Sequence, residues 1–290
     1  MLNTETTPTA VNVFHPIDGI ETATAVAYDD ILSNIKNNVK TYGSLMPRLH
    51  KLPEFHKVKG KDKPIAIVGG GPTIKHYIDD IRQYRTVMAA GSCHDYLREN
   101  NINITYTAVC DPDPIVMKYL QKPDTETKYL LASGCDSAVY EHLKDHQRVM
   151  WHCHSDTYKP DEIEPEYQGV GGGCTVGLRA LNIAILLGYS NVHLFGMDSC
   201  MGESSHAYEA EDVGKIYDIA ASVNKTTAPT KSKVWKVAGY QLAQAYQFID
   251  FYSKWHMYFT PTIFGDSLLA DIMKNININM QLLDTQGVKQ

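Results

Sequence analysis

Short apolar runs alternate with longer segments of mixed polarity through the middle of the chain. The apolar runs predict buried strands at residues 65–69, 86–91, 106–111, 128–134, 148–154 and 191–198. The intervening segments predict helices at residues 72–84, 93–100, 113–121, 136–144 and 174–187. Because short apolar strands that alternate with helices build parallel sheets, we expect an α/β fold: a doubly wound, mostly parallel, Rossmann-like sheet with helices on both faces.

The N-terminal part of the chain has a different pattern. Residues 1–25 are polar and contain prolines, which predicts a loose arm, and apolar residues at helical spacing predict an amphipathic helix at 28–46. A charged linker at 57–64 follows. We therefore divide the chain into an N-terminal arm with a helical appendage, residues 1–62, and a Rossmann-like domain, residues 63–290.

The C-terminal third of the chain departs from the alternation. Residues 231–255 predict a long helix, 257–265 a strand and 266–275 a short helix. The aromatic run YQLAQAYQFIDFY fits the core-facing stripe of that long helix. The polar segment 223–234 has the composition of a mobile loop or lid.

Composition and charge exclude several classes of protein. Of the 290 residues, 43% are hydrophobic and 21% are charged, which is typical of a soluble globular domain with a substantial core. The net charge of −6 argues against a nucleic-acid partner, which usually requires a basic face. No apolar run reaches the length of a membrane span, and the N-terminus lacks the basic start and apolar core of a secretory signal.

The cysteines favour a reducing compartment. The six cysteines are spread along the chain without a CxxC pair, so neither a zinc ribbon nor a disulfide framework is indicated. A cytoplasmic location is the simplest interpretation. The sequence leaves the oligomeric state open, a homo-oligomer included.

The segment PIAIVGGGPTIKHYIDD, residues 64–80, predicts a strand that runs into a phosphate-binding turn. Glycines let the backbone approach an anion, and a helix N-terminus offers it free N–H groups. Ile74 stands where both a P-loop and a dinucleotide fingerprint need glycine, and Gly91-Ser92 ends the next strand in place of an acid. We therefore expect a nucleotide phosphate bound outside both motifs, or a tight turn without a ligand. The turn residues are Gly69, Gly70, Gly71, Pro72 and Thr73.

Polar residues follow several of the predicted strands. In open parallel sheets, ligands bind beyond the carboxyl ends of the strands, so these residues should converge on one crevice. Besides the glycine turn, the residues expected there are Ser92, Asp111, Asp113, His152, His154, Gly171, Gly172, Gly173, Thr175 and Asp198.

The segment CDPDP carries two carboxylates that flank a proline. Asp111 and Asp113 could hold Mg²⁺ that bridges phosphate oxygens, which is the usual mode of magnesium binding. The alternative is that Asp113 only caps the following helix.

A second glycine-rich turn, GVGGGCT, precedes a helix that is apolar nearly all round. Thr175 is the candidate cap of this helix, whose N–H groups offer a second contact for a nucleotide. The alternative is that Gly171 to Gly173 only permit close packing. In WHCHSD, His152 and His154 face the same way in a strand, but a metal site needs a third ligand that the sequence does not identify, so substrate contact or polar packing is favoured.

Three stretches together resemble the 6-hydroxymethylpterin diphosphokinase-like family, with its flagellin-modifying accessory proteins and related bacterial sialyltransferases. They are GGGPT, AAGSCHDYLRENNINITYTAVCDPDP and GVGGGCTVGLRALNIAILLGYSNVHLFGMDSC, within residues 65–206. The resemblance implies a nucleotide-using transferase, a catalytic or metal-binding role for Asp198, and a role for His206 as a general base or phosphate contact. It also favours substrate or metal contact by Asp111. Gly70 stands where the family usually has asparagine.

Three hypotheses follow for the function. The first is a Mg²⁺-dependent transferase that moves diphosphate from ATP to a hydroxymethyl acceptor, with Asp111, Asp113 and Asp198 holding metal and phosphate. The second is a sialyltransferase-like glycosyltransferase that uses a CMP-sugar without metal, with His206 or His154 as the base. The third is a non-catalytic nucleotide-binding module. The Asp-Pro-Asp pair favours the first.

Overall fold

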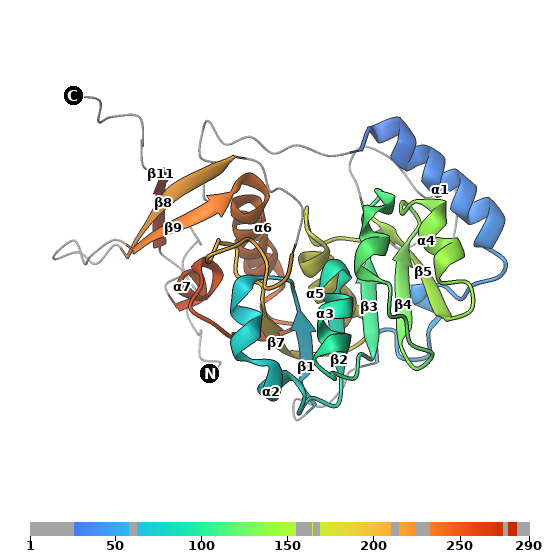
Figure 1. The fold of residues 1–290 in the computed structure, drawn as a ribbon, viewed down its shortest axis with the longest axis horizontal. Coiled ribbons are helices and arrows are strands. Elements are labelled where there is room, and N and C mark those ends of the chain that lie inside the picture. The colour runs from blue at the N-terminus through green and yellow to red at the C-terminus, as the bar shows by residue number, and fades with distance from the viewer. Residues whose placement is uncertain are drawn as a thin grey trace, which may run out of the picture.

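The computed structural model is built around one large parallel sheet (Figure 1). Its eight strands lie in the order β10-β7-β1-β2-β3-β4-β5-β6, and every pairing is parallel. The strands are β1 (Ile65–Val68), β2 (Val87–Ala90), β3 (Tyr106–Val109), β4 (Lys128–Ala132), β5 (Gln147–Cys153), β6 (Gly169–Val170), β7 (Asn191–Phe195) and β10 (Thr260–Ile263). The structure describes residues 26–57, 63–154, 164, 169–209, 215–223, 233–274 and 278–282.

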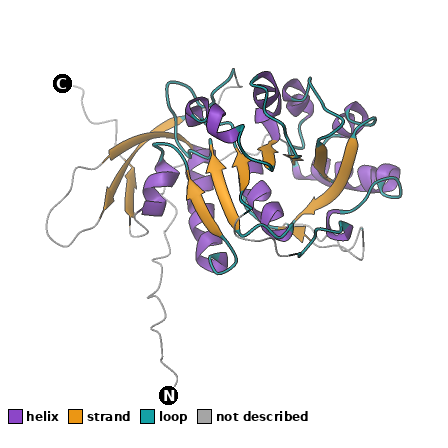
Figure 2. Cartoon of the chain, turned by 90° about the horizontal axis from the view of Figure 1, so that it is seen from below, coloured by secondary structure: helices purple, strands orange, loops and turns teal. Residues whose placement is uncertain are grey.

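The strands form because their sequences are apolar on both faces. All four residues of β1, β2 and β3 are buried, as expected for strands covered by helices on both sides. Figure 2 shows helices on both sides of the orange strands. The predicted α/β, Rossmann-like fold is therefore confirmed.

The helices that connect the strands are shorter than the sequence pattern predicts. They are α2 (Ile78–Ile81), α3 (His94–Glu99), α4 (Ser137–His142) and α5 (Val176–Leu186). The helix predicted at 72–84 is instead a 3-10 turn, Pro72–His76, followed by α2, because the backbone leaves helical geometry at Tyr77 (φ −123°, ψ 13°). The helix predicted at 113–121 is also a 3-10 turn, Pro114–Tyr119.

The predicted amphipathic helix at the N-terminal side is α1 (Tyr28–Tyr42), which packs on α4. Its buried Asn38 donates hydrogen bonds to the carbonyl oxygens of Ser133 (2.9 Å) and Cys135 (2.7 Å). The segment after α1 adds Met46 and Leu49 to the main core. The arm predicted at residues 1–25 lies outside the described residues.

A second, antiparallel sheet stands beside the first and has the strand order β11-β8-β9 (Figure 1). Its strands are β8 (Ile216–Val223), β9 (Lys233–Ala238) and β11 (Ile278–Leu282). The long helix predicted at 231–255 is wrong in its first part, which is β9. Trp235 and Val237 are buried while Lys236 between them is exposed, a strand periodicity that ends where α6 (Gly239–Trp255) begins.

The remaining C-terminal elements follow the prediction. The strand predicted at 257–265 is β10, and the short helix predicted at 266–275 is α7 (Leu268–Lys274). The predicted loop at 223–234 falls mostly outside the described residues.

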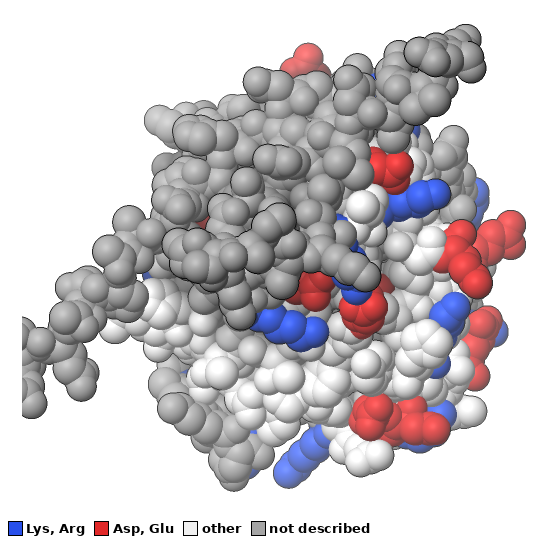
Figure 3. All heavy atoms as spheres, turned by 90° about the vertical axis from the view of Figure 1, so that its left-hand side faces the viewer, with Lys and Arg blue, Asp and Glu red and all other residues white. Residues whose placement is uncertain are grey.

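The described surface and helices can be compared with the sequence-based expectations about nucleic-acid and membrane partners. On the face shown in Figure 3, the lysine and arginine side chains of the described residues lie beside acidic side chains, so this part of the surface presents no continuous basic area. Among the described helices, none combines the length and apolar composition that a bilayer crossing requires.

Candidate functional site

A pocket lies where the chain changes direction across the sheet. The chain runs from β1 through β6 toward one edge, and α5 then returns it to β7, on the other side of β1. Ligands of open α/β sheets bind beyond the carboxyl ends of the strands at such a switch point. The glycine-turn pocket found there has a volume of about 130 Å³. It is lined by Gly69, Gly70, Gly71, Ala90, Ser92, Thr175, Val176, Gly177, Gly196, Met197, Asp198, Ser199, Ser205, His206, Tyr240, Gln241 and Gln244.

The glycine turn after β1 is packed tightly against the end of β7. The Gly69 N–H donates to Phe195 O and the Gly71 N–H to Gly196 O, both at 2.8 Å. A Cβ atom at Gly69 would lie 2.5 Å from Gly196 O, and one at Gly71 would lie 2.5 Å from Asp198 Oδ2. Glycine is therefore required for packing at both positions, and the turn lines the pocket as well.

Asp198 holds the glycine turn in place. Its Oδ2 accepts a hydrogen bond from the Thr73 N–H (2.8 Å), and its Oδ1 accepts one from Thr73 Oγ (2.6 Å). Burial raises the pKa of Asp198 to about 6, although the two bonds from Thr73 act to lower it. Since each oxygen accepts one hydrogen bond from Thr73, Asp198 positions the turn, and each oxygen keeps a second lone pair for a further partner.

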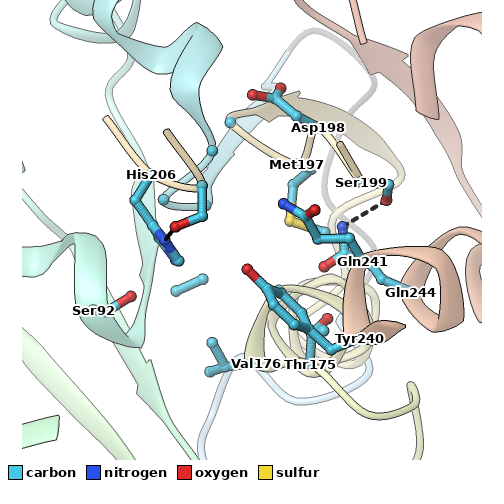
Figure 4. Close-up of a pocket in the computed structure, with 17 residues that line it drawn as sticks. Ser92, Thr175, Val176, Met197, Asp198, Ser199, His206, Tyr240, Gln241 and Gln244 are labelled. Atoms are coloured by element: carbon cyan, nitrogen blue, oxygen red, sulfur yellow. Dashed lines mark hydrogen bonds between the residues drawn. The ribbon is translucent and has the colours of Figure 1, made fainter. Parts of the chain in front are cut away.

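His206 brings a titratable ring into the pocket (Figure 4). Ser205 Oγ lies 2.9 Å from His206 Nδ1, and the Ala207 N–H donates to Gly70 O (3.0 Å), which ties this segment to the glycine turn. Burial lowers the pKa of His206 below its ordinary value of 6.5, so the ring is neutral at pH 7. In the tautomer that donates its Nδ1 proton to Ser205, Nε2 is free to accept a proton.

Gly70 permits a close approach by two side chains of this segment. A Cβ atom at Gly70 would overlap with Tyr208 Oη and would lie 2.6 Å from His206 Cδ2. Tyr208 Oη is fixed by a hydrogen bond of 2.7 Å with Ser92 Oγ. The space that a side chain at Gly70 would fill is therefore occupied by Tyr208 and His206.

Two helix N-termini face the pocket from the other side. Thr175 Oγ accepts from the Leu178 N–H (3.5 Å) at the start of α5, which leaves the N–H groups of Val176 and Gly177 without partners inside the helix. At the start of α6, the Gln244 amide donates to Ser199 Oγ (2.9 Å). These helix ends contribute positive partial charge to the pocket, which favours an anion beside the Asp198 carboxylate.

Tyr240 adds a hydroxyl group to the pocket. Its side chain projects from the start of α6 toward the centre of the pocket (Figure 4), and its Oη is buried without a hydrogen-bond partner among the described residues. Burial raises the pKa of Tyr240 to about 12, so the phenol stays protonated and can donate. A buried donor of this kind is satisfied by a bound water or by a ligand atom.

The structure brings seven of the residues predicted from sequence together and leaves the others outside the lining. Those in the pocket are Gly69, Gly70, Gly71, Ser92, Thr175, Asp198 and His206. Pro72 is buried in the turn behind them, and Thr73 acts through Asp198. Gly172 and Gly173 have positive φ angles of 124° and 100° and turn the chain into α5 without lining the pocket, as does Gly171 before them.

Asp111 and Asp113 form a turn outside the pocket. Asp111 Oδ1 accepts from the Asp113 N–H (3.0 Å), and Asp113 Oδ1 accepts from the Ile115 N–H (2.8 Å), so Asp113 caps the 3-10 turn as the alternative reading expects. Neither side chain lines the glycine-turn pocket. The metal and catalytic role of Asp111 stays a prediction.

The pocket offers one protein carboxylate to a magnesium ion. Asp198 is the single carboxylate among the lining residues that the structure describes, and each of its oxygens already accepts one hydrogen bond from Thr73. Within the described part of the chain, no group of three or more His, Cys, Asp or Glu residues could ligate a metal. Magnesium usually needs one or two protein carboxylates beside the phosphates.

His152, in β5, and His154, just after it, lie in different environments. His152 is buried, with Nδ1 2.7 Å from Ser133 Oγ and Nε2 2.6 Å from Glu164 Oε2. Arg48 also pairs with Glu164. His152 therefore belongs to a polar network that joins β5 to the segment after α1, whereas His154 is exposed at the end of the strand.

Several pocket residues could not be found from sequence. Tyr240, Gln241 and Gln244 come from α6, where the aromatic run suggests a core-facing stripe. The one signal in the sequence was that polar glutamines interrupt the apolar stripe. Both glutamines are buried in the structure, so their amide groups need hydrogen-bond partners. Gln241 finds them in the Ala238 N–H (2.9 Å) and Cys200 O (3.1 Å).

Comparisons with known proteins agree on the family and the fold. The family model described as 6-hydroxymethylpterin diphosphokinase MptE-like matches residues 30–204. The MAf glycosyltransferase from Magnetospirillum magneticum AMB-1 superposes with a TM-score of 0.62 and 15% identity over 84% of this chain. This chain spans 38% of the length of that glycosyltransferase. No curated protein sequence matches.

Two sialyltransferases superpose less closely. A mammalian sialyltransferase in complex with Gal-beta-1-3GalNAc-ortho-nitrophenol has a TM-score of 0.40 and 12% identity over 83% of this chain and 87% of its own. The sialyltransferase CstII from Campylobacter jejuni, in complex with cytidine-5'-monophosphate, has a TM-score of 0.34 and 16% identity over 78% and 92%.

Proposed function

This chain belongs to the 6-hydroxymethylpterin diphosphokinase MptE-like family, and from its pocket we propose that it is a glycosyltransferase that uses a CMP-sugar donor without a metal ion. One observation carries the proposal. The glycine-turn pocket combines two helix N-termini and a neutral histidine, while its one described carboxylate is already engaged by Thr73.

The pocket suits a single phosphate group better than a triphosphate. A CMP-sugar carries one phosphodiester with one negative charge, which backbone N–H groups at the start of α5 can bind directly. ATP carries a larger charge that is normally neutralised by Mg²⁺, and among the described lining residues Asp198, which also accepts two hydrogen bonds from Thr73, is the one carboxylate that could hold that ion. The volume of about 130 Å³ also limits the enclosed part of the ligand to the phosphate and its neighbours.

In the proposed reaction, His206 Nε2 accepts the proton of an acceptor hydroxyl group. The acceptor oxygen forms a bond with the anomeric carbon of the sugar, and the bond between that carbon and the phosphate oxygen breaks. CMP leaves with the bonding electrons. The start of α5 and the Tyr240 hydroxyl stabilise the charge that develops on the phosphate.

The fold accommodates this chemistry, since one protein that shares it is a glycosyltransferase. The assignment itself depends on the pocket, because related folds host unrelated reactions.

Diphosphate transfer from ATP is the second candidate. The family description favours it, as does Asp111, which is exposed at the carboxyl end of β3 where a metal-bound phosphate could reach it. In that reaction Mg²⁺ would neutralise the phosphates, and Asp111 would be its protein ligand.

Calorimetric titration with CMP and ATP, each with EDTA and with Mg²⁺, separates the candidates. We expect CMP to bind with an affinity that EDTA does not change, because backbone N–H groups at the helix N-termini bind the phosphate directly. Binding of ATP only when Mg²⁺ is present would support diphosphate transfer instead. Binding of CMP without turnover of a CMP-sugar would support a non-catalytic module.

A further inference from the structure

A second cavity, the tyrosine groove, adjoins the glycine-turn pocket. It has a volume of about 670 Å³ and shares Ser92 with the lining of that pocket. The groove lies between α3, the 3-10 turn at Pro114–Tyr119 with the residues after it, and the segment that follows His206. Its lining is Ser92, Asp95, Tyr96, Glu99, Lys118, Tyr119, Gln121, Lys122, Tyr208 and Glu209.

Three tyrosine rings form one continuous aromatic wall. The ring centroid of Tyr208 lies 5.6 Å from that of Tyr96 and 5.8 Å from that of Tyr119, with interplanar angles of 39° and 57°. The bond between Tyr208 Oη and Ser92 Oγ fixes the central ring. Because neither neighbouring ring is parallel to Tyr208, the wall is curved, which suits the C–H faces of a non-planar sugar ring better than a flat base.

The charges around the groove disfavour an anionic ligand. Three carboxylates, from Asp95, Glu99 and Glu209, stand against two lysines, Lys118 and Lys122. Lys122 pairs with Glu99 at 2.6 Å. Asp95 accepts hydrogen bonds from the Gln121 and Lys122 N–H groups. Glu99 and Glu209 are therefore the carboxylates that suit a ligand with hydroxyl donors, while phosphate is favoured at the helix N-termini of the other pocket.

The groove ends beside the candidate base. The ring centroids of His206 and Tyr208 are 5.3 Å apart, and Ser92 lines both cavities. A ligand that packs on Tyr208 therefore places a hydroxyl group next to the His206 ring.

We propose that the tyrosine groove binds the acceptor, a neutral carbohydrate, and directs one of its hydroxyl groups to His206. This inference rests on the proposed function. In the transfer step, that hydroxyl oxygen bonds to the anomeric carbon of the donor sugar, its proton passes to His206 Nε2, and the carbon–phosphate oxygen bond breaks to release CMP.

The test uses the full chain on a printed array of neutral and anionic glycans, followed by titration of the strongest neutral ligand. Tyr119→Ala removes one wall of the groove without touching the glycine-turn pocket. Tyr258→Ala is the matched control, since Tyr258 is 62% exposed at the far end of α6. We expect Tyr119→Ala to weaken neutral glycan binding roughly tenfold or more and Tyr258→Ala to leave it unchanged.

Titration of CMP into the same variants distinguishes a loss of acceptor binding from a loss of donor binding. CMP affinity should be the same in both variants as in the natural chain. Absence of any neutral glycan ligand, unchanged glycan binding in Tyr119→Ala, or weakened CMP binding in that variant would overturn the proposal. If circular dichroism shows Tyr119→Ala to be unfolded, Tyr96→Ala replaces it under the same criteria. Glycan binding without any CMP binding would refute the donor assignment and not the groove.

Discussion

Replacing His206 with glutamine should lower the rate of glycosyl transfer by about 10²–10⁴-fold, the usual contribution of a general base. Glutamine can keep the hydrogen bond to Ser205, but it cannot accept the proton of the acceptor hydroxyl. Burial lowers the pKa of His206 below 6.5, so the rate of the natural chain should rise as the pH increases through that lowered pKa and the ring loses its proton. The glutamine variant should lose this acid limb of the pH profile.

His256→Gln is the matched control, because His256 is exposed at the end of α6 and lies outside the pocket lining. The initial rate of sugar transfer and the CMP affinity are measured for both variants between pH 5 and pH 8. A His206→Gln chain that keeps more than roughly a tenth of the rate, or that keeps the acid limb, would show that His206 is not the base.

Placing alanine at Gly70 should lower transfer about 10²-fold, the cost that a shift of about 1 Å in catalytic groups can have. The new Cβ would overlap with Tyr208 Oη and lie 2.6 Å from His206 Cδ2, so the segment that carries both must move. Overpacking of this kind should also lower the free energy of unfolding by about 1–3 kcal/mol. Urea denaturation and the rate of transfer give the two values.

A second substitution tests whether the overlap with Tyr208 causes the loss of stability in Gly70→Ala. Tyr208→Ala removes the overlapping ring, so the Gly70→Ala/Tyr208→Ala chain should be more stable than the sum of the two single changes predicts. Gly134→Ala serves as the comparison with a milder conflict, because its Cβ would lie 3.3 Å from the nearest atom, Ile31 Cγ2, which must shift only slightly. Strict additivity of the two changes would contradict a steric conflict between Gly70 and Tyr208.

The fold could be predicted well where local pattern and tertiary structure agree. The strands β1, β2 and β3 are short apolar runs that are buried on both faces, so their sequence alone indicates a parallel sheet. The strand β9 was missed because Trp235 and Val237 continue into the apolar pattern of α6, and only the pairing with β8 decides that this segment is extended.

The site could be predicted where backbone geometry demands particular residues. The glycine turn requires residues without a side chain, and Asp198 ends a buried strand at the switch point, so both carry a local signal. Tyr240 carries none, because its place in the pocket depends on how α6 packs beside the second sheet. Asp113 caps the 3-10 turn, and its metal role stays a prediction because capping and ligation use the same residue type.

The most direct test of metal-independent glycosyl transfer is to incubate the chain with CMP-N-acetylneuraminic acid and a neutral glycan acceptor, or with ATP and a hydroxymethylpterin acceptor, each in EDTA and in Mg²⁺, and to quantify the released nucleotide. We predict release of CMP in EDTA that His206→Gln slows by about 10²–10⁴-fold and His256→Gln does not, with no AMP formed from ATP. Formation of AMP from ATP that requires Mg²⁺, without release of CMP from the sugar donor, would contradict the proposed function and identify diphosphate transfer instead.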